Sequence, residues 1–162
     1  MSSSKEQEIM RMVAQAAAFY HRLLLLVGPS ESGKTVLLHQ CVKTNGWPIV
    51  NLNLELSQKL LPLTQRQRPL HAQKLLDDTM AQIANPVVLL DNTEILFDNN
   101  LQLDPLRLLQ GISRNRTVVA SWNGAVADGQ LTYATPEHQE FRKYPSQDLL
   151  LVAMDKNMTP QT

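Results

Sequence analysis

The sequence predicts a single α/β domain in which a mainly parallel sheet of five strands is covered by helices on both faces. Short apolar runs of strand length alternate with longer segments in which apolar residues recur every three or four positions. Three strand-like runs also end in polar residues, and ligands of parallel sheets bind where the strands end. At 162 residues, the chain is long enough for one domain with a hydrophobic core.

The hydrophobic periodicity also predicts the order of the elements. We expect helices over residues 4–21, 36–42, 54–61, 70–84 and 101–112, and strands over residues 23–27, 48–53, 87–91, 117–123 and 148–154. Residues 124–129 are expected to form a loop, and residues 130–144 fit either a hairpin or a strand followed by a short helix. The domain organisation is therefore an N-terminal helix (1–22), one domain (23–156) and a flexible tail (157–162).

Composition and charge exclude several classes of protein. Lysine plus arginine equals aspartate plus glutamate at 15 each, so no net charge attracts nucleic acid or anionic membranes, although a local basic patch stays open. Cys41 is the single cysteine, which excludes an intrachain disulfide. The N-terminus is polar, and no apolar run reaches the roughly 18 residues of a membrane helix, so we expect a soluble, cytoplasmic protein.

The most informative motif is G-x-x-x-x-G-K-T between the first sheet strand and the following helix, which is the phosphate-binding P-loop, or Walker A. Its glycines let the backbone curl so that N–H groups and a helix N-terminus face phosphate oxygens. Lys34 supplies a cation for the β- and γ-phosphates, and the Thr35 hydroxyl is placed to ligate Mg²⁺. The expected residues for ATP or ADP are Gly28, Pro29, Ser30, Glu31, Ser32, Gly33, Lys34, Thr35 and Val36.

A second magnesium ligand is expected at Asp91, which ends an apolar strand in the pattern called Walker B. The alternative is that Asp91 caps the following segment. The four histidines are scattered without metal-ligand spacing, so no metal other than Mg²⁺ is expected.

Hydrolysis also needs a group that orients the attacking water. In many ATPases with an extra strand between the two Walker strands, that group is a glutamate directly after the Walker B aspartate, but here the position is Asn92. Glu94 is the nearest carboxylate, and it either reaches the water or is a solvated residue at a helix start. Nucleotide binding is therefore predicted more firmly than catalysis.

Other polar residues are candidates for the γ-phosphate. Asn123 ends the fourth strand, where it either contacts the phosphate or the water or forms a turn before Gly124. Arg142 precedes the last strand and is a candidate arginine finger acting on a neighbouring subunit, the alternative being a surface cation beside Glu140. Arg66 and Arg68 are expected to be solvated loop charges. The candidate catalytic residues are Lys34, Asp91, Glu94, Asn123 and Arg142.

From its first sheet strand to its last, the chain resembles the AAA+ class of P-loop ATPases. The resemblance rests on Walker A, on Asp91 as Walker B and on Asn123 as the first sensor. It implies a three-layer P-loop NTPase core with strand order 5-1-4-3-2. The chain stops where AAA+ proteins continue into a helical lid, so no C-terminal lid is expected. The run of residues 91–94 looks like the variant found in DnaA-related replication regulators.

The length of this lidless core, together with the stretches 122–124 and 131–134, resembles the BrxF family, the small P-loop proteins of type 3 bacteriophage-exclusion (BREX) loci. The resemblance implies a phage-defence role with partners that include a DNA methyltransferase and a larger ATPase. Three functions are compared: a slow ATPase whose nucleotide state controls assembly with such partners or with itself, a nucleotide-gated adaptor without turnover, and a small-molecule kinase. The proline-bounded loop of residues 62–69 is the feature that favours the kinase.

Overall fold

The structure is a computed structural model and describes residues 4–154. Its helices are α1 (Ser4–Ala16), α2 (Lys34–Asn45), α3 (Leu52–Leu60), α4 (Arg68–Ala81) and α5 (Pro105–Ile112), with 3-10 helices η1 (Thr93–Phe97) and η2 (Asn99–Leu101). Its strands are β1 (Leu23–Gly28), β2 (Ile49–Asn51), β3 (Val87–Asp91), β4 (Thr117–Ala127), β5 (Gln130–Tyr133), β6 (Arg142–Pro145) and β7 (Leu150–Ala153).

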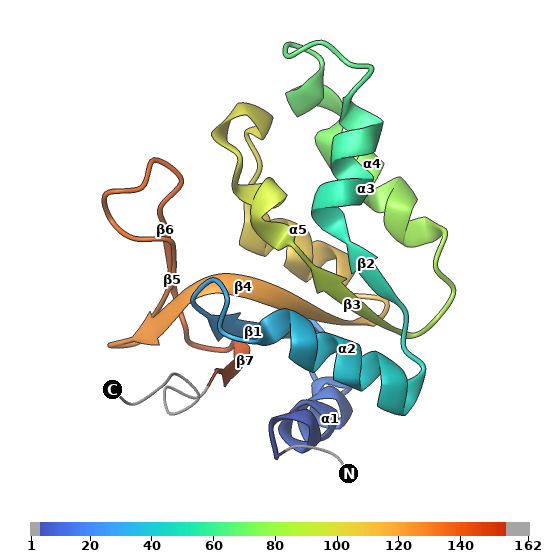
Figure 1. Cartoon of the computed structure of the whole chain (residues 1–162), viewed down its shortest axis with the longest axis vertical. Helices are drawn as coiled ribbons and strands as arrows, with labels where there is room; N and C mark the ends of the chain where they lie inside the picture. The colour runs from blue at the N-terminus through green and yellow to red at the C-terminus, as the bar shows by residue number, and fades with distance from the viewer. Residues whose placement is uncertain (1–3, 155–162) are drawn as a thin grey trace.

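The predicted parallel core is confirmed. Five strands pair in the order β2-β3-β4-β1-β7 with every pairing parallel, which is the predicted order 5-1-4-3-2 read from the other edge. Helices α1 and α2 cover one face of this sheet, and α3, α4 and α5 cover the other (Figure 1). The molecule therefore has three layers, with the loop between β1 and α2 at the carboxyl end of a central strand.

Strand β1 shows how the sequence fills both layers. All of its residues are buried, because helices cover the sheet on both sides. Its side chains alternate between the faces: Leu24 and Leu26 join the core cluster beneath α1 and α2. Leu23, Leu25 and Val27 join the larger cluster beneath α3, α4 and α5. The apolar run that looked uniform in the sequence thus serves two separate cores.

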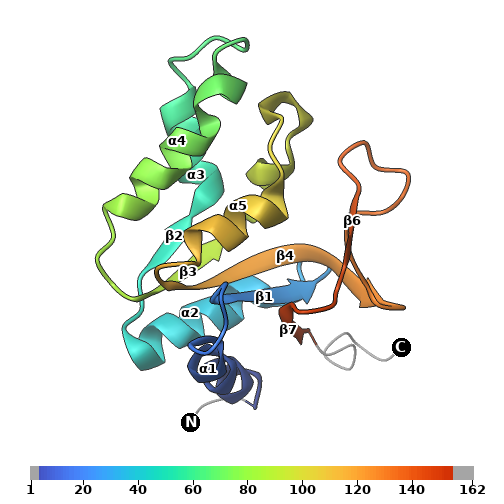
Figure 2. The same ribbon diagram turned by 180° about the vertical axis from the view of Figure 1, so that it is seen from behind.

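The expected loop of residues 124–129 is wrong for residues 124–127, which belong to a strand. Strand β4 continues to Ala127 and turns back into β5, with which it pairs antiparallel, and β5 pairs with β6. The hairpin interpretation of residues 130–144 is therefore confirmed (Figure 2), and Leu131 and Tyr133 of β5 join the core cluster beneath α3, α4 and α5. Gly124 makes this close approach possible, because a Cβ atom at this position would lie 1.7 Å from the backbone oxygen of Thr132.

Several predicted boundaries were also wrong. Helix α1 ends at Ala16 rather than at residue 21, and the chain then turns so that the Arg22 N–H reaches the Ser113 carbonyl at 2.8 Å. Tyr20 falls within the expected helix but beyond its observed end, and it is 69% exposed. Residues 93–101 form the 3-10 helices η1 and η2, so α5 begins only at Pro105, whose fixed φ suits a first helical turn.

Two expectations concern the ends and the surroundings of the chain. The expected tail, residues 157–162, lies outside the described residues. Within residues 4–154, no helix combines the length and apolar character required to cross a membrane.

Candidate nucleotide-binding site

The P-loop, β3 and β4 meet around a cavity of about 370 Å³ at the carboxyl edge of the sheet. Its lining comprises Ser30, Glu31, Gly33, Lys34, Thr35, Val36, Asp91, Asn92, Glu94, Ser121 and Asn123. The structure thus brings together four of the five candidate catalytic residues, all except Arg142, and most of the predicted nucleotide-binding loop.

The loop is held open by its glycines. Gly33 has φ 97°, in the left-handed region that favours glycine, and it directly precedes α2 without a side-chain cap. The first N–H groups of a helix have no intrahelical partner, and the first three residues of α2, Lys34 to Val36, line the cavity. Gly28 is packed against the loop, since a Cβ there would lie 2.6 Å from Ser32 Oγ. This is the arrangement expected of an anion-binding helix terminus.

The ammonium of Lys34 is folded back onto its own loop. Nζ donates hydrogen bonds to the carbonyls of Gly28 at 2.9 Å and Pro29 at 2.6 Å, and contacts Ser32 Oγ at 3.3 Å. Burial lowers the pKa of Lys34 from its ordinary 10.5, while the carboxylates of Glu94 and Asp91 oppose this shift. All three acceptors of this buried ammonium are neutral. The ammonium can therefore exchange these hydrogen bonds for stronger, charge-assisted bonds to a phosphate.

Thr35 and Asp91 converge on the other side of the cavity. The Thr35 hydroxyl donates a 2.7 Å hydrogen bond to Oδ2 of Asp91, which is itself only 6% exposed. Within the described part of the chain, no cluster of three or more His, Cys, Asp or Glu residues could hold a metal by itself. A hydroxyl and one carboxylate nevertheless fit Mg²⁺, which binds oxygen and commonly completes its shell with water and substrate phosphates.

The chain after Asp91 turns sharply enough to bring Glu94 into the cavity. Asn92 adopts the left-handed conformation, with φ 54° and ψ 50°. The Thr93 hydroxyl then donates a 2.6 Å hydrogen bond to the Ser121 carbonyl, which ties η1 to β4. Glu94 therefore lines the site, and its Oε2 accepts a 2.8 Å hydrogen bond from Nδ2 of Asn123.

Three aromatic side chains pack together next to Glu94 and Asn123 and connect η1, β4 and β5. Phe97, at the end of η1, stacks on Tyr133 with ring centroids 3.5 Å apart and meets Trp122 edge-on at 5.0 Å. The Trp122 indole donates to the Thr132 carbonyl at 3.0 Å. The two side chains that meet in the cavity, Glu94 and Asn123, thus sit on segments that share one rigid aromatic cluster.

Arg142 is not part of this cavity. It lies on β6, where Nη2 donates a 3.1 Å hydrogen bond to the Leu103 carbonyl of the same chain. Its role as a finger for a neighbouring subunit stays a prediction. Arg68 is half-buried rather than solvated, contrary to expectation, whereas Arg66 is exposed as expected.

The sequence interpretation missed three contributors to the site. The sequence analysis considers Asn92 only as the residue that replaces the usual catalytic glutamate. In the structure Asn92 lines the cavity, and so does Ser121. Ser121 is a polar residue in an apolar strand and lies two positions before Asn123, so both side chains are on the same face of the strand. This spacing could have predicted that Ser121 belongs to the site. Met154 packs its side chain against the position where Gly28 would carry a Cβ. No local pattern predicts that last contact.

With the P-loop between β1 and α2, this sheet order is that of a P-loop NTPase core. No protein-family model matches the sequence, and no curated protein matches it. Among solved structures, the chain is similar to PCH-2 from C. elegans, with 22% identity and a TM-score of 0.42 over 78% of this chain and 38% of that one. It is also similar to AMPPCP-bound DnaA from Aquifex aeolicus, with 13% identity and a TM-score of 0.46 over 96% of this chain and 48% of that one.

The chain therefore spans less than half of the length of either solved structure. Both TM-scores lie below 0.5, so what those two proteins bind is not carried over to this chain.

Proposed function

We propose that this protein binds ATP together with Mg²⁺ in the cavity beside the P-loop and hydrolyses it slowly. The observation that supports this proposal is the 2.7 Å hydrogen bond between Thr35 and Asp91, next to a loop that presents backbone N–H groups and the Lys34 ammonium. The hydroxyl and the carboxylate that P-loop sites use around magnesium are thus in direct contact here.

The charges of the cavity favour nucleotide with magnesium over nucleotide alone. The lining contains three carboxylates, from Glu31, Asp91 and Glu94, but the single ammonium of Lys34. A bare triphosphate would meet this negative excess at close range. A divalent cation held by Thr35 and Asp91 supplies the missing positive charge, so binding is expected to depend strongly on Mg²⁺.

Slow hydrolysis follows from the surroundings of Glu94. It is the carboxylate placed to act as a base, because Asp91 is occupied by Thr35. One of its oxygens already accepts a hydrogen bond from Asn123, so that oxygen is engaged within the protein. A water molecule would therefore meet a partly engaged base, whereas Lys34 and the loop N–H groups still bind phosphate.

The direct test is binding of ATP and ADP to the purified chain, with Mg²⁺ and with a chelator. Saturable binding that requires the Lys34 side chain and is strengthened by Mg²⁺ is the expected result. Absence of saturable binding to either nucleotide would remove the proposal. Asp91→Asn and Lys34→Ala separate the metal from the phosphate contribution, and Arg66→Gln, an exposed change outside the cavity, is the matched control.

A nucleotide-gated adaptor without turnover is the second candidate, and Asn92 is the observation that favours it. Asn92 occupies the left-handed turn directly after Asp91, where an amide cannot serve as a base. Phosphate release by the wild type, Lys34→Ala and Glu94→Gln distinguishes the two. Slow release that both substitutions abolish supports the ATPase, and equal background in all three supports the adaptor.

The cellular role that we propose is that of a cytoplasmic, nucleotide-controlled component of a bacteriophage-exclusion complex. This proposal is supported by the sequence resemblance to the BrxF family. The partners would include a DNA methyltransferase and a larger ATPase, and ATP would also drive self-assembly in which Arg142 completes a neighbouring site. Loss of phage protection in Lys34→Ala cells tests the role. Solution mass with and without ATP, for the wild type and Arg142→Ala, tests the assembly.

A further inference from the structure

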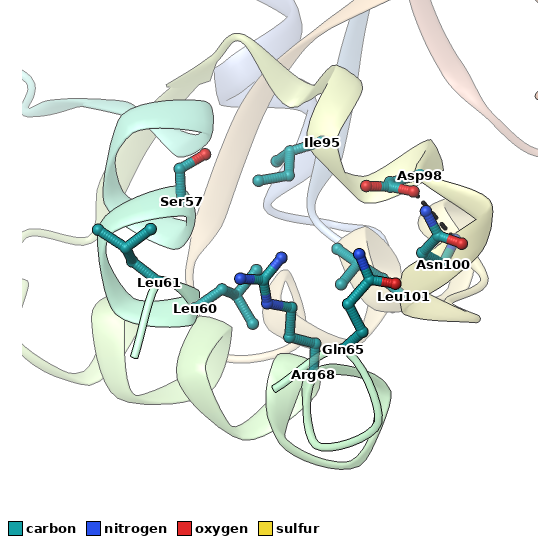
Figure 3. A pocket seen from close by; sticks show the side chains of 9 residues that line it. All are labelled: Ser57, Leu60, Leu61, Gln65, Arg68, Ile95, Asp98, Asn100 and Leu101. Atoms are coloured by element: carbon teal, nitrogen blue, oxygen red, sulfur yellow. Dashed lines mark hydrogen bonds between the residues drawn. The ribbon is translucent and has the colours of Figure 1, made fainter. Parts of the chain in front are cut away.

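A second pocket also borders η1, and Ile95 is the residue of this 3-10 helix that lines it. It has a volume of about 240 Å³ and is formed between the α3–α4 connection and the two 3-10 helices, as Figure 3 shows. Its lining comprises Ser57, Leu60, Leu61, Gln65, Arg68, Ile95, Asp98, Asn100 and Leu101. None of these residues lines the nucleotide cavity.

Two opposite charges face this pocket without neutralising each other. Arg68 and Asp98 are both half-buried and project from different walls (Figure 3). Nε of Arg68 donates a 3.2 Å hydrogen bond to the Leu63 carbonyl, and no described residue accepts a hydrogen bond from its Nη groups. Asp98 accepts the Asn100 N–H at 2.9 Å, and among residues 4–154 it has no cationic partner. Each charge therefore keeps binding capacity for a ligand.

The rest of the pocket is an apolar floor with a polar rim. Leu60 and Leu101 are 5% and 3% exposed, and Ile95 contributes a half-buried side chain beside them. The side-chain amides of Gln65 and Asn100 lie at the exposed edge. A cation, an anion and an aliphatic surface in one small pocket match a ligand that carries the complementary three features.

We propose that this pocket binds a small zwitterion with an aliphatic side chain, that is, a free α-amino acid of the leucine type. The ligand carboxylate would pair with the Nη groups of Arg68, whose planar fork suits two oxygens. The α-ammonium would pair with Asp98, and the aliphatic group would cover Leu60 and Leu101. A ligand of one charge alone would leave the opposite half-buried charge without a partner.

The pocket is also linked to the nucleotide site by consecutive residues. Glu94 lines the nucleotide cavity, and Ile95, the next residue of η1, lines this pocket. A ligand that fixes Ile95 therefore restricts the backbone that places Glu94 beside Asn123. Occupancy of the pocket is expected to change nucleotide affinity, and nucleotide is expected to change the affinity of the pocket by the same factor. This coupling rests on the proposed function, whereas binding of the amino acid does not.

Protein-observed NMR with the nucleotide-free chain tests the binding. L-leucine is expected to shift the side-chain amides of Gln65 and Asn100 and the methyl signals of Ile95. N-acetyl-L-leucine lacks the ammonium, L-leucinamide lacks the carboxylate and glycine lacks the side chain, so each should bind at least about tenfold more weakly. Arg68→Gln and Asp98→Asn should abolish the preference, while Arg66→Gln, on the same loop but outside the pocket, should bind like the wild type. Asn at position 98 keeps an oxygen that can accept the Asn100 N–H.

The proposal fails if leucine shifts none of these signals up to about 20 mM, well above the millimolar range expected for a ligand of this size. Equal binding of leucine and its two single-charge analogues would also overturn it. Lys34→Ala should leave leucine binding unchanged. A failure at the nucleotide site is thereby distinguished from a failure of this pocket. Coupling is then read as the change in ADP affinity upon adding leucine, which Arg68→Gln should remove.

Discussion

The hydroxyl of Thr35, at the start of α2, donates a 2.7 Å hydrogen bond to the carboxylate of Asp91, at the end of β3. The two residues come from different strand–helix units and meet only because β1 and β3 flank β4 in the sheet. Because we propose that this hydroxyl and this carboxylate ligate Mg²⁺, the contact gives a sharp test of the proposed site.

Asp91→Asn should abolish most of the Mg²⁺ dependence of ATP binding. The substitution keeps an oxygen that Thr35 can donate to but removes the charge, and bonds to charged groups contribute about 1.5–3 kcal/mol. We therefore expect at least about a tenfold loss of ATP affinity in the presence of Mg²⁺ and little change in its absence. Titration calorimetry under both conditions measures this. Equal losses with and without the metal would contradict a metal-ligand role for Asp91.

Nucleotide affinity should begin to fall at a lower pH than it would if Lys34 had the pKa of an ordinary lysine. Burial lowers the pKa of Lys34 below its usual 10.5, so its ammonium is lost as pH rises through that lowered value. Loss of this cation weakens attraction for phosphate. ADP affinity measured from pH 7 upwards should decline before pH 10.5, and Lys34→Ala should show no such decline. A wild-type profile parallel to that of Lys34→Ala would refute the assignment.

Asn123→Asp should suppress phosphate release more than nucleotide binding. The new carboxylate would face Glu94, whose oxygen now lies 2.8 Å from the Asn123 amide nitrogen. A carboxylate cannot donate this hydrogen bond and repels its neighbour, so Glu94 would leave the position in which Asn123 now holds it. We expect at least about a tenfold slower release at neutral pH and a smaller loss of ADP affinity. Unchanged turnover would mean that Glu94 has no part in hydrolysis.

Gly124→Ala should destabilise the domain, whereas Gly111→Ala should not. A Cβ at position 124 would lie 1.7 Å from the Thr132 backbone oxygen, so the β5–β6 hairpin would have to move. Overpacking of this kind costs about 1–3 kcal/mol or more. Gly111, inside α5, has open space around its Cβ position, and alanine there should stabilise the chain by about 0.5–1 kcal/mol. Urea denaturation of both variants measures the difference, and a stable Gly124→Ala would contradict the close approach.

Cys41 should resist thiol reagents in the folded chain. It lies on the buried face of α2 and is fully buried, and burial together with the Glu6 charge raises its pKa from 9.0 to about 11. The thiol therefore stays protonated and inaccessible at neutral pH, and its stabilising contribution is lost only as pH rises from about 9 through 11. Iodoacetamide should modify it rapidly in urea and slowly without urea. Rapid native labelling at pH 7.5 would show that α2 opens readily.

Much of the proposed site could be predicted from local sequence because most of its residues lie close together along the chain. The P-loop needs its glycines, lysine and threonine within eight consecutive positions, and the structure places most of them around one cavity. Asp91 was found in the same way, from an apolar run that ends in a carboxylate. The parallel order of the sheet was likewise expected and is confirmed.

The extension of β4 could not be predicted in this way. Residues 124–127 resemble a loop in sequence, and they became a strand only because β5 offers hydrogen bonds across a close approach that Gly124 permits. The left-handed turn at Asn92, which brings Glu94 to Asn123, could not be predicted from hydrophobic periodicity either. It is stabilised by a hydrogen bond from Thr93 to Ser121 on another strand.

The sequence by itself determined where the proposed phosphate site lies, since phosphate binding would depend on backbone angles and charges that neighbouring residues set. Only the tertiary structure decided which distant groups share that site and which lie elsewhere. It brought Glu94 to Asn123, held Arg142 against Leu103 and placed Arg68 across from Asp98. The reason is physical: these partners are far apart along the chain, and their meeting depends on strand order and helix packing rather than on local preference.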